Sequence, residues 1–153
     1  MLPAELRRTI ELAFADVTLG DGVGLWEAQA IDNYEGADER LRARNQDQKL
    51  DWKKITDADL IRCHISLSFF DENGMRFHLP AFMLSEEFQE SMYTFLLSYL
   101  IDMNDLVLSL FSSLTMGQRA AVRKYLIWCS NQKLYEDRKE EIEISLKEYW
   151  LEN

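Results

Sequence analysis

Residues 66–82 constrain the fold of this chain more than any other stretch; they read Ser-Leu-Ser-Phe-Phe-Asp-Glu-Asn-Gly-Met-Arg-Phe-His-Leu-Pro-Ala-Phe. Apolar and polar residues alternate on both sides of Asp71-Glu-Asn-Gly74. Such alternation is typical of a half-buried strand, and Asn-Gly between two alternating runs is a strong signal for a tight turn. The sequence therefore predicts a β-hairpin over about residues 64–82.

The register of this hairpin depends on the length of its loop. A three-residue loop, a type I turn followed by Gly74 in the left-handed region, pairs Phe69 with Phe77 and gathers the apolar residues on one face. That face holds Ile65, Leu67, Phe69, Phe77 and Leu79, and the opposite face holds Ser66, Ser68, Phe70, Arg76 and His78. A two-residue loop would mix polar and apolar residues on both faces. Burial therefore favours the three-residue loop and predicts a positive φ at Gly74.

Most other apolar residues recur at helical spacing. Helices are predicted over about residues 3–18, 25–31, 37–50, 57–62, 85–99, 106–114, 116–129 and 135–151. The helix over 37–50 is expected to be exposed, with a narrow buried edge at Leu41 and Leu50. No linker or repeat interrupts this order, and 153 residues match one ordinary domain. The predicted fold class is α+β: one mostly helical domain over residues 1–153, with one β-hairpin.

The chain is strongly acidic, with 27 acidic and 17 basic residues and a net charge of −10. A field of this sign repels phosphate backbones, so nucleic-acid binding is not expected. It attracts a basic protein partner instead. Cys63 and Cys129 flank apolar runs without zinc-ligand spacing, which indicates buried, reduced thiols. The longest apolar region, residues 92–114, is interrupted by charged residues, so no membrane span is expected and the predicted location is cytoplasmic.

The partner-binding surface is predicted on the last helix, where carboxylates crowd a narrow apolar edge. Its residues are Glu136, Asp137, Glu140, Glu141 and Glu143. Residues 35–51 are a weaker candidate because three arginines dilute their negative charge. The favoured function is a non-catalytic binding protein of the immunity-protein kind, which neutralises a basic toxin such as a nuclease. The sequence does not define the oligomeric state.

An alternative function uses the polar face of the hairpin. There Ser68 lies opposite His78, and Arg76 could bind an anionic group of a small ligand or substrate. No catalytic residue is assigned, because a serine hydrolase also needs an orienting acid and an oxyanion hole. No cofactor and no metal site are predicted, since His64 and His78 lack further ligands at a matching spacing. The glycines at positions 20, 22 and 24 are read as a tight interhelical turn.

Two stretches, Gly22–Asp32 and Phe70–Phe82, resemble the signature of a family of small bacterial proteins classed as a domain of unknown function. The resemblance covers nearly the whole chain and implies no activity, because the family has none assigned. The positions that match the pattern are Asp32, Asp71, Gly74, Arg76, Phe77, Leu79 and Pro80. In size and charge, small acidic bacterial proteins of this kind are similar to immunity proteins.

Overall fold

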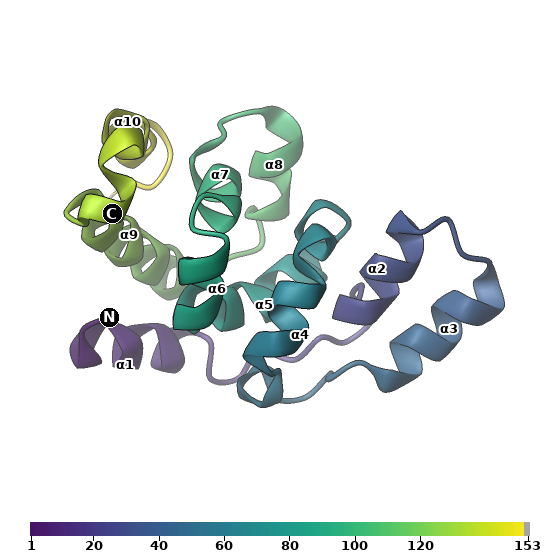
Figure 1. Cartoon of the computed structure of the whole chain (residues 1–153). Coiled ribbons are helices and arrows are strands. Elements are labelled where there is room, and N and C mark those ends of the chain that lie inside the picture. Colours follow the sequence, from purple (N-terminus) through teal and green to yellow (C-terminus); the bar gives the residue numbers. More distant parts are fainter. Residues whose placement is uncertain (152–153) are drawn as a thin grey trace.

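The computed structural model describes residues 1–151, and these fold into helices joined by short loops (Figure 1). The α-helices are α1 (Ala4–Ala13), α2 (Leu25–Asp32), α3 (Ala37–Gln46), α4 (Asp57–Arg62), α5 (Glu72–Leu84), α6 (Glu86–Ser91), α7 (Phe95–Ile101), α8 (Asp105–Leu110), α9 (Met116–Ser130) and α10 (Lys139–Glu148). Three 3₁₀ helices accompany them: η1 (Trp52–Lys54), η2 (His64–Ser68) and η3 (Lys133–Arg138).

The centre of the fold is α5, which Figure 1 shows between α2 on one side and α6 and α7 on the other. Residues 77–84 are all buried, and so are Gly74 and Met75. The helix packs against α1, α6, α8 and η1. A helix buried on nearly every side needs apolar residues all round instead of along one stripe.

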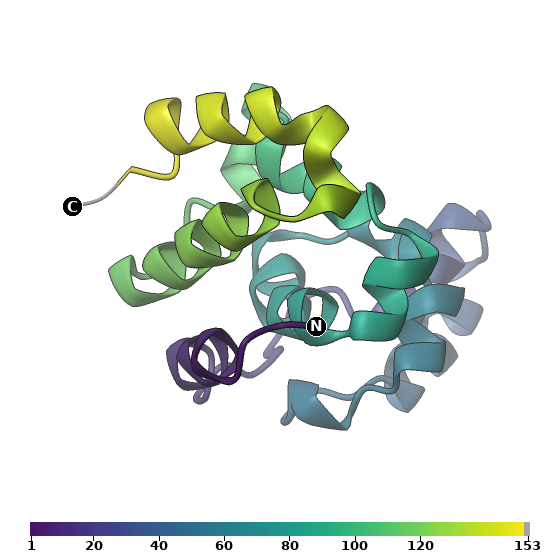
Figure 2. The ribbon, with the colours of Figure 1, turned by 60° about the vertical axis from the view of Figure 1, so that its left-hand side comes forward.

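Helices α1, α9 and α10 lie together beside this centre. In Figure 2, α1 and α10 lie on either side of α9, and both pack against it. Thr115 caps α9 together with Gln118, each side chain bonding the other's backbone N–H at 3.0–3.1 Å. The chain end is held by Trp150, whose buried indole donates a hydrogen bond to the Leu100 carbonyl at 2.7 Å.

The β-hairpin predicted over residues 64–82 does not form, so the predicted α+β class is wrong. No strand occurs within residues 1–151, and the segment folds instead as η2 followed by α5. Asp71-Glu-Asn-Gly74 is the start of a helix: Asp71 is the N-cap of α5, and its Oδ1 accepts a hydrogen bond from the Gly74 N–H at 2.8 Å. Asp, Asn and Gly favour turns and helix starts alike, so the same residues fit both structures.

The predicted cross-strand pairs and the predicted positive φ at Gly74 are also wrong, because both depended on the hairpin. Ile65 and Leu67 lie in η2, whereas Phe77 and Leu79 lie in α5, so the predicted cross-strand pairs do not exist. Gly74 has no positive φ; among residues 1–151, positive φ angles occur at Gly20 and Tyr34. Pro80 lies inside α5, where it leaves one carbonyl of the preceding turn without its usual donor. Proline is unfavourable inside a helix, so packing outweighs the local preference at this position.

The other predicted helices occur, but several of their bounds were wrong. The first ends at Ala13 instead of residue 18, and the segment predicted as one helix over 135–151 divides into η3 and α10. The expected buried edge at Leu41 and Leu50 is wrong, because these side chains are 57% and 77% exposed. The helix predicted over 85–99 breaks into α6 and α7 at Met92, which has a non-helical ψ of 49°. Thr56 caps α4 through the Asp59 N–H at 3.2 Å, as its position before the helix predicts.

Candidate functional site

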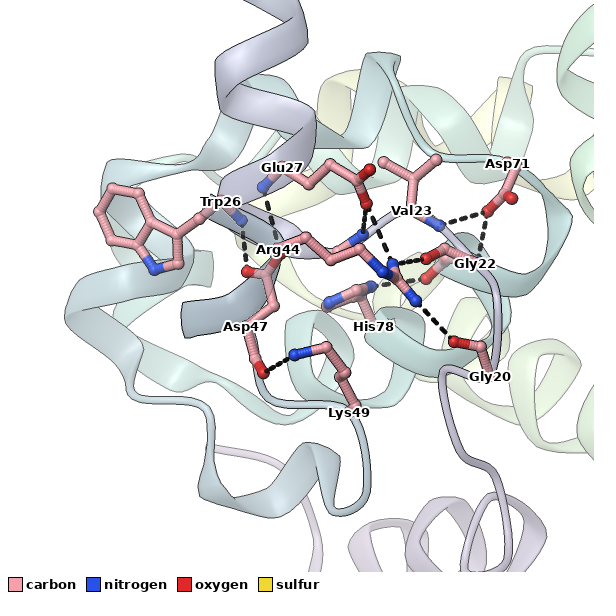
Figure 3. A network of polar contacts seen from close by, with 12 residues as sticks. Gly20, Gly22, Val23, Trp26, Glu27, Arg44, Asp47, Lys49, Asp71 and His78 are labelled. Carbon is pink, nitrogen blue, oxygen red and sulfur yellow. Dashed lines mark hydrogen bonds and ion pairs between the residues drawn. The ribbon is translucent and has the colours of Figure 1, made fainter. Parts of the chain in front are cut away.

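The first turn of α2 is capped from outside the helix by a buried aspartate. The Trp26 N–H donates to Asp47 Oδ1 at 2.7 Å, and the Glu27 N–H donates to Asp47 Oδ2 at 3.1 Å (Figure 3). These are two of the amide groups that a helix N-terminus leaves without intrahelical partners. Asp47 follows α3 directly, so this contact also fixes how α3 lies against α2.

Burial raises the pKa of Asp47 to about 6. The hydrogen bonds from the two backbone N–H groups and the ammonium of Lys49 act in the opposite direction, because they favour the ionised carboxylate. The ordinary pKa of an aspartate is about 3.9. The folded protein therefore holds this proton more tightly than the unfolded chain does. Ionisation of Asp47 lowers the stability of the fold as pH rises from about 4 to about 6, and its effect is constant at higher pH.

We expect the side-chain carboxyl carbon of Asp47 to titrate with a midpoint near pH 6 in ¹³C NMR. The exposed carboxylates Glu140 and Glu143 provide reference signals in the same spectra. Desolvation is the cause of the shift, so a midpoint near 4 would mean that Asp47 is open to water.

A second group of contacts ties α3 to the loop before α2. Arg44 donates to Glu27 Oε1 at 3.1 Å, to the Gly20 carbonyl at 2.7 Å and to the Gly22 carbonyl. Glu27 accepts a further bond from the Gly24 N–H at 3.1 Å. The side chains of Arg44 and Glu27 are only 22% and 16% exposed, so the ion pair is partly shielded from solvent.

Asp71 joins the same loop to α5. A single oxygen, Oδ1, accepts from the Val23 N–H at 3.0 Å and from the Gly74 N–H at 2.8 Å. The two backbones approach so closely that a Cβ on Gly74 would lie 2.5 Å from the Val23 carbonyl oxygen, and one on Gly22 would lie 2.7 Å from Asn73 Cβ. The stretches Gly22–Asp32 and Phe70–Phe82 are thus in direct contact. We call Glu27, Arg44, Asp47 and Asp71 the α2 cap network.

His78 is a buried histidine with one unpartnered nitrogen. Its Nδ1 donates to the Gly74 carbonyl at 2.6 Å, and its ring stacks on Phe70 with centroids 4.4 Å apart. Nε2 has no hydrogen-bond partner within residues 1–151. Burial lowers the pKa of His78 to about 4, so the ring is neutral at physiological pH. The neutral ring with its proton on Nδ1 offers Nε2 as a hydrogen-bond acceptor.

The structure does not bring together the three residues predicted on a polar hairpin face. The hydroxyl of Ser68 is exposed and contacts the hydroxyl of Tyr99. Arg76 bonds the side chain of Asn73 at 3.0 Å. His78 is fully buried. A joint site of these side chains is therefore not formed, because their common face depended on strand geometry.

The predicted partner-binding carboxylates lie on one continuous segment of η3 and α10. Glu136, Asp137, Glu140, Glu141 and Glu143 are all exposed. Glu141 forms a two-pronged ion pair with Arg138, at 2.9 and 3.0 Å. Its charge is partly neutralised, whereas the other four side chains have no ion pair within residues 1–151.

The sequence prediction missed the α2 cap network, although Asp71 and Gly74 were among its matched positions. Glu27 was detectable in principle, because an acid three residues after the cap position is typical of a helix start. Asp47 carries no such signal, since it caps a helix that begins more than twenty residues earlier. Within residues 1–151, no three His, Cys, Asp or Glu side chains gather as a metal-binding group. Nor does any helix there combine the length and apolar character needed to cross a bilayer.

These features define an all-helical protein with a partly buried polar network at the junction of α2, α3 and α5. The chain belongs to a family of unknown function, DUF6714, whose model matches residues 3–153. No curated protein and no solved structure matches it.

Proposed function

We propose that this protein is a non-catalytic binding protein that recognises a basic protein partner through the carboxylates of η3 and α10. The net charge of −10 carries the proposal, because an excess of this size attracts cationic surfaces over distances near the Debye length. The same charge disfavours nucleic acid as the partner. A bacterial immunity protein that neutralises a toxin in the cytoplasm, such as a basic nuclease, fits this description.

The geometry supplies a reason to prefer the C-terminal segment over α3. In Figure 1, α10 and α3 lie at opposite ends of the molecule. The carboxylates of α3 share their helix with Arg40, Arg42 and Arg44, and Glu39 lies 4.0 Å from Arg42. On η3 and α10, four of the five predicted carboxylates have no basic side chain of residues 1–151 at ion-pair distance.

The proposal is tested by purifying the protein with the product of the adjacent gene. We expect a complex at low salt whose association rate falls as salt rises, because long-range attraction governs the encounter. Absence of a complex at low salt would remove the main support for the proposal.

A triple substitution locates the binding surface. Glu136→Gln, Glu140→Gln and Glu143→Gln remove unpaired charges, and we expect slower association with a flatter salt dependence. Stability should change by less than about 0.5 kcal/mol, because exposed charges contribute little. The matched control is Glu35→Gln, Asp38→Asn and Glu39→Gln, which removes three charges at the other end. If both triple variants slow association equally, net charge and not this surface determines recognition.

A further inference from the structure

A pocket of about 250 Å³ opens beside the α2 cap network. Its walls come from the start of α2, the segment after α3, the region around η1 and α4, and His78 of α5. The volume is several times the ~30 Å³ that one water occupies in the liquid. It is slightly below the ~300–1,000 Å³ of pockets that bind drug-sized molecules. The pocket therefore suits a group of side-chain size.

The base of this pocket holds an unmatched acceptor. His78 is fully buried and lines the pocket, and its Nε2 has no partner within residues 1–151. Because Nδ1 donates to the Gly74 carbonyl, the ring proton is on Nδ1 and Nε2 has none. Buried polar atoms without partners are rare in folded proteins. The atom that satisfies Nε2 must therefore be a hydrogen-bond donor.

The charges around the pocket favour a cationic donor. Asp47, Asp59 and Trp26 line the pocket, which places two acidic residues and one aromatic residue in its walls. Aromatic rings attract cations. The environment of Trp26 already accommodates one guanidinium, since Arg62 lies 5.7 Å from its ring centroid. Guanidinium and ammonium groups have several N–H donors and no acceptor, which matches this set of acceptors.

Within residues 1–151, Lys54 is the one cation among the residues that line the pocket, and it offers a partner for an anionic group of the ligand. It is exposed, in contrast to buried Asp47 and His78. A ligand with a cation near Asp47 and His78 and a carboxylate toward Lys54 would pair with the charges of Asp47 and Lys54.

We propose that this pocket binds a guanidinium or alkylammonium group, which donates N–H bonds to His78 Nε2 and to the carboxylates of Asp47 and Asp59. The group belongs either to a free amino acid or amine, or to an arginine or lysine side chain of a protein. This proposal is independent of partner binding by η3 and α10.

The first experiment is an NMR titration of the intact protein with methylguanidinium, n-butylamine and L-arginine. We expect saturable shifts of the His78 Nε2 resonance, with the resonances of His64 unchanged because His64 does not line the pocket. N-methylurea is the matched control, since it has nearly the shape of methylguanidinium without the charge. Equal shifts with N-methylurea would overturn a cation site, and so would no shift with any probe up to about 10 mM, a concentration that detects millimolar affinity.

Two variants assign the contacts. Asp59→Asn removes a pocket charge without touching the cap of α2, and we expect it to weaken methylguanidinium binding about tenfold. His78→Phe preserves a ring but removes the acceptor, and it should abolish the shifts that methylguanidinium causes in the indole N–H resonance of Trp26, which also lines the pocket. If this variant does not fold, Asp59→Asn and the parent titration decide. Unchanged affinity in Asp59→Asn would overturn the assigned cation contacts.

A comparison of two arginine derivatives identifies the source of the cation. Tighter binding of L-arginine than of N-acetyl-L-argininamide, with the preference lost in Lys54→Gln, supports a free amino acid. Tighter binding of the blocked derivative supports a side chain of a protein. If neither derivative binds, the proposal is wrong.

Discussion

An Asp47→Ala variant is expected to be less stable than the parent protein by about 2–4 kcal/mol. The substitution removes the acceptor of two backbone N–H groups, those of Trp26 and Glu27. Each buried donor left without a partner costs about 1–3 kcal/mol. Relief of the buried charge offsets part of this loss, because burial raises the pKa of Asp47. Chemical denaturation at pH 7 measures the change as a lower midpoint.

The matched control is Asp51→Ala. Asp51 also caps a short helix, but it accepts only one N–H, that of Lys53, at 3.0 Å and at an exposed position. Water can replace this acceptor, so we expect a loss of at most about 1 kcal/mol. Equal effects of the two substitutions would show that burial of the Asp47 cap does not determine its contribution.

Helix ends with a local cap could be predicted from the sequence. Thr56 and Thr115 each precede an apolar periodic run by one residue, and each accepts a bond from the N–H three positions later. The information for such a cap lies within four residues. The starts of α4 and α9 were therefore predictable.

The central helix could not be predicted in this way. Alternation around residues 66–70 and 75–79 matches a strand, but α5 is buried on nearly all sides, so helical periodicity is absent from its sequence. Pro80 is also unfavourable inside a helix. Packing by α1, α6 and α8 outweighs these local signals, and that packing is not encoded in any short window.

The candidate site could not be predicted from the sequence either, because tertiary packing brings its residues together. Asp47 and His78 are far apart in the sequence, and each has its role only because α2, α3 and α5 meet. The glycines at positions 20, 22 and 24 were interpreted only as a turn, although a glycine can also indicate a close contact with another part of the chain. A Cβ on Gly24 would lie 1.9 Å from Asp47 Oδ2, so the loop needs glycine there to admit the cap.

The cap network and the pocket form one structural unit. Asp47 caps the start of α2 and also lines the pocket. The Gly74 carbonyl accepts a hydrogen bond from His78 Nδ1–H, and Gly74 lies against the Val23 carbonyl. A change that moves the loop before α2 therefore also moves the pocket wall. Rigid positioning by several hydrogen bonds lowers the entropy cost of binding a small group.

A Gly74→Ala variant is expected to lose about 1–3 kcal/mol of stability, the usual cost of forcing an extra methyl into a packed site. The reason is steric and not conformational: the new Cβ would lie 2.5 Å from the Val23 carbonyl oxygen. That oxygen belongs to the backbone, so the loop must move and strain the two bonds that Asp71 accepts. Helix propensity alone predicts the opposite sign, a gain of about 1 kcal/mol.

Gly117→Ala separates the two contributions. Gly117 also lies in the first turn of a helix, α9, but the nearest atom to its added Cβ is Thr115 Oγ1 at 3.9 Å, an ordinary contact. Here propensity acts unopposed, and we expect a gain of about 0.5–1 kcal/mol. Thermal unfolding of both variants should therefore give melting temperatures on opposite sides of the parent value. Stabilisation by Gly74→Ala would mean that the loop before α2 does not contact α5 as described, and the pocket beside it would lose its fixed wall.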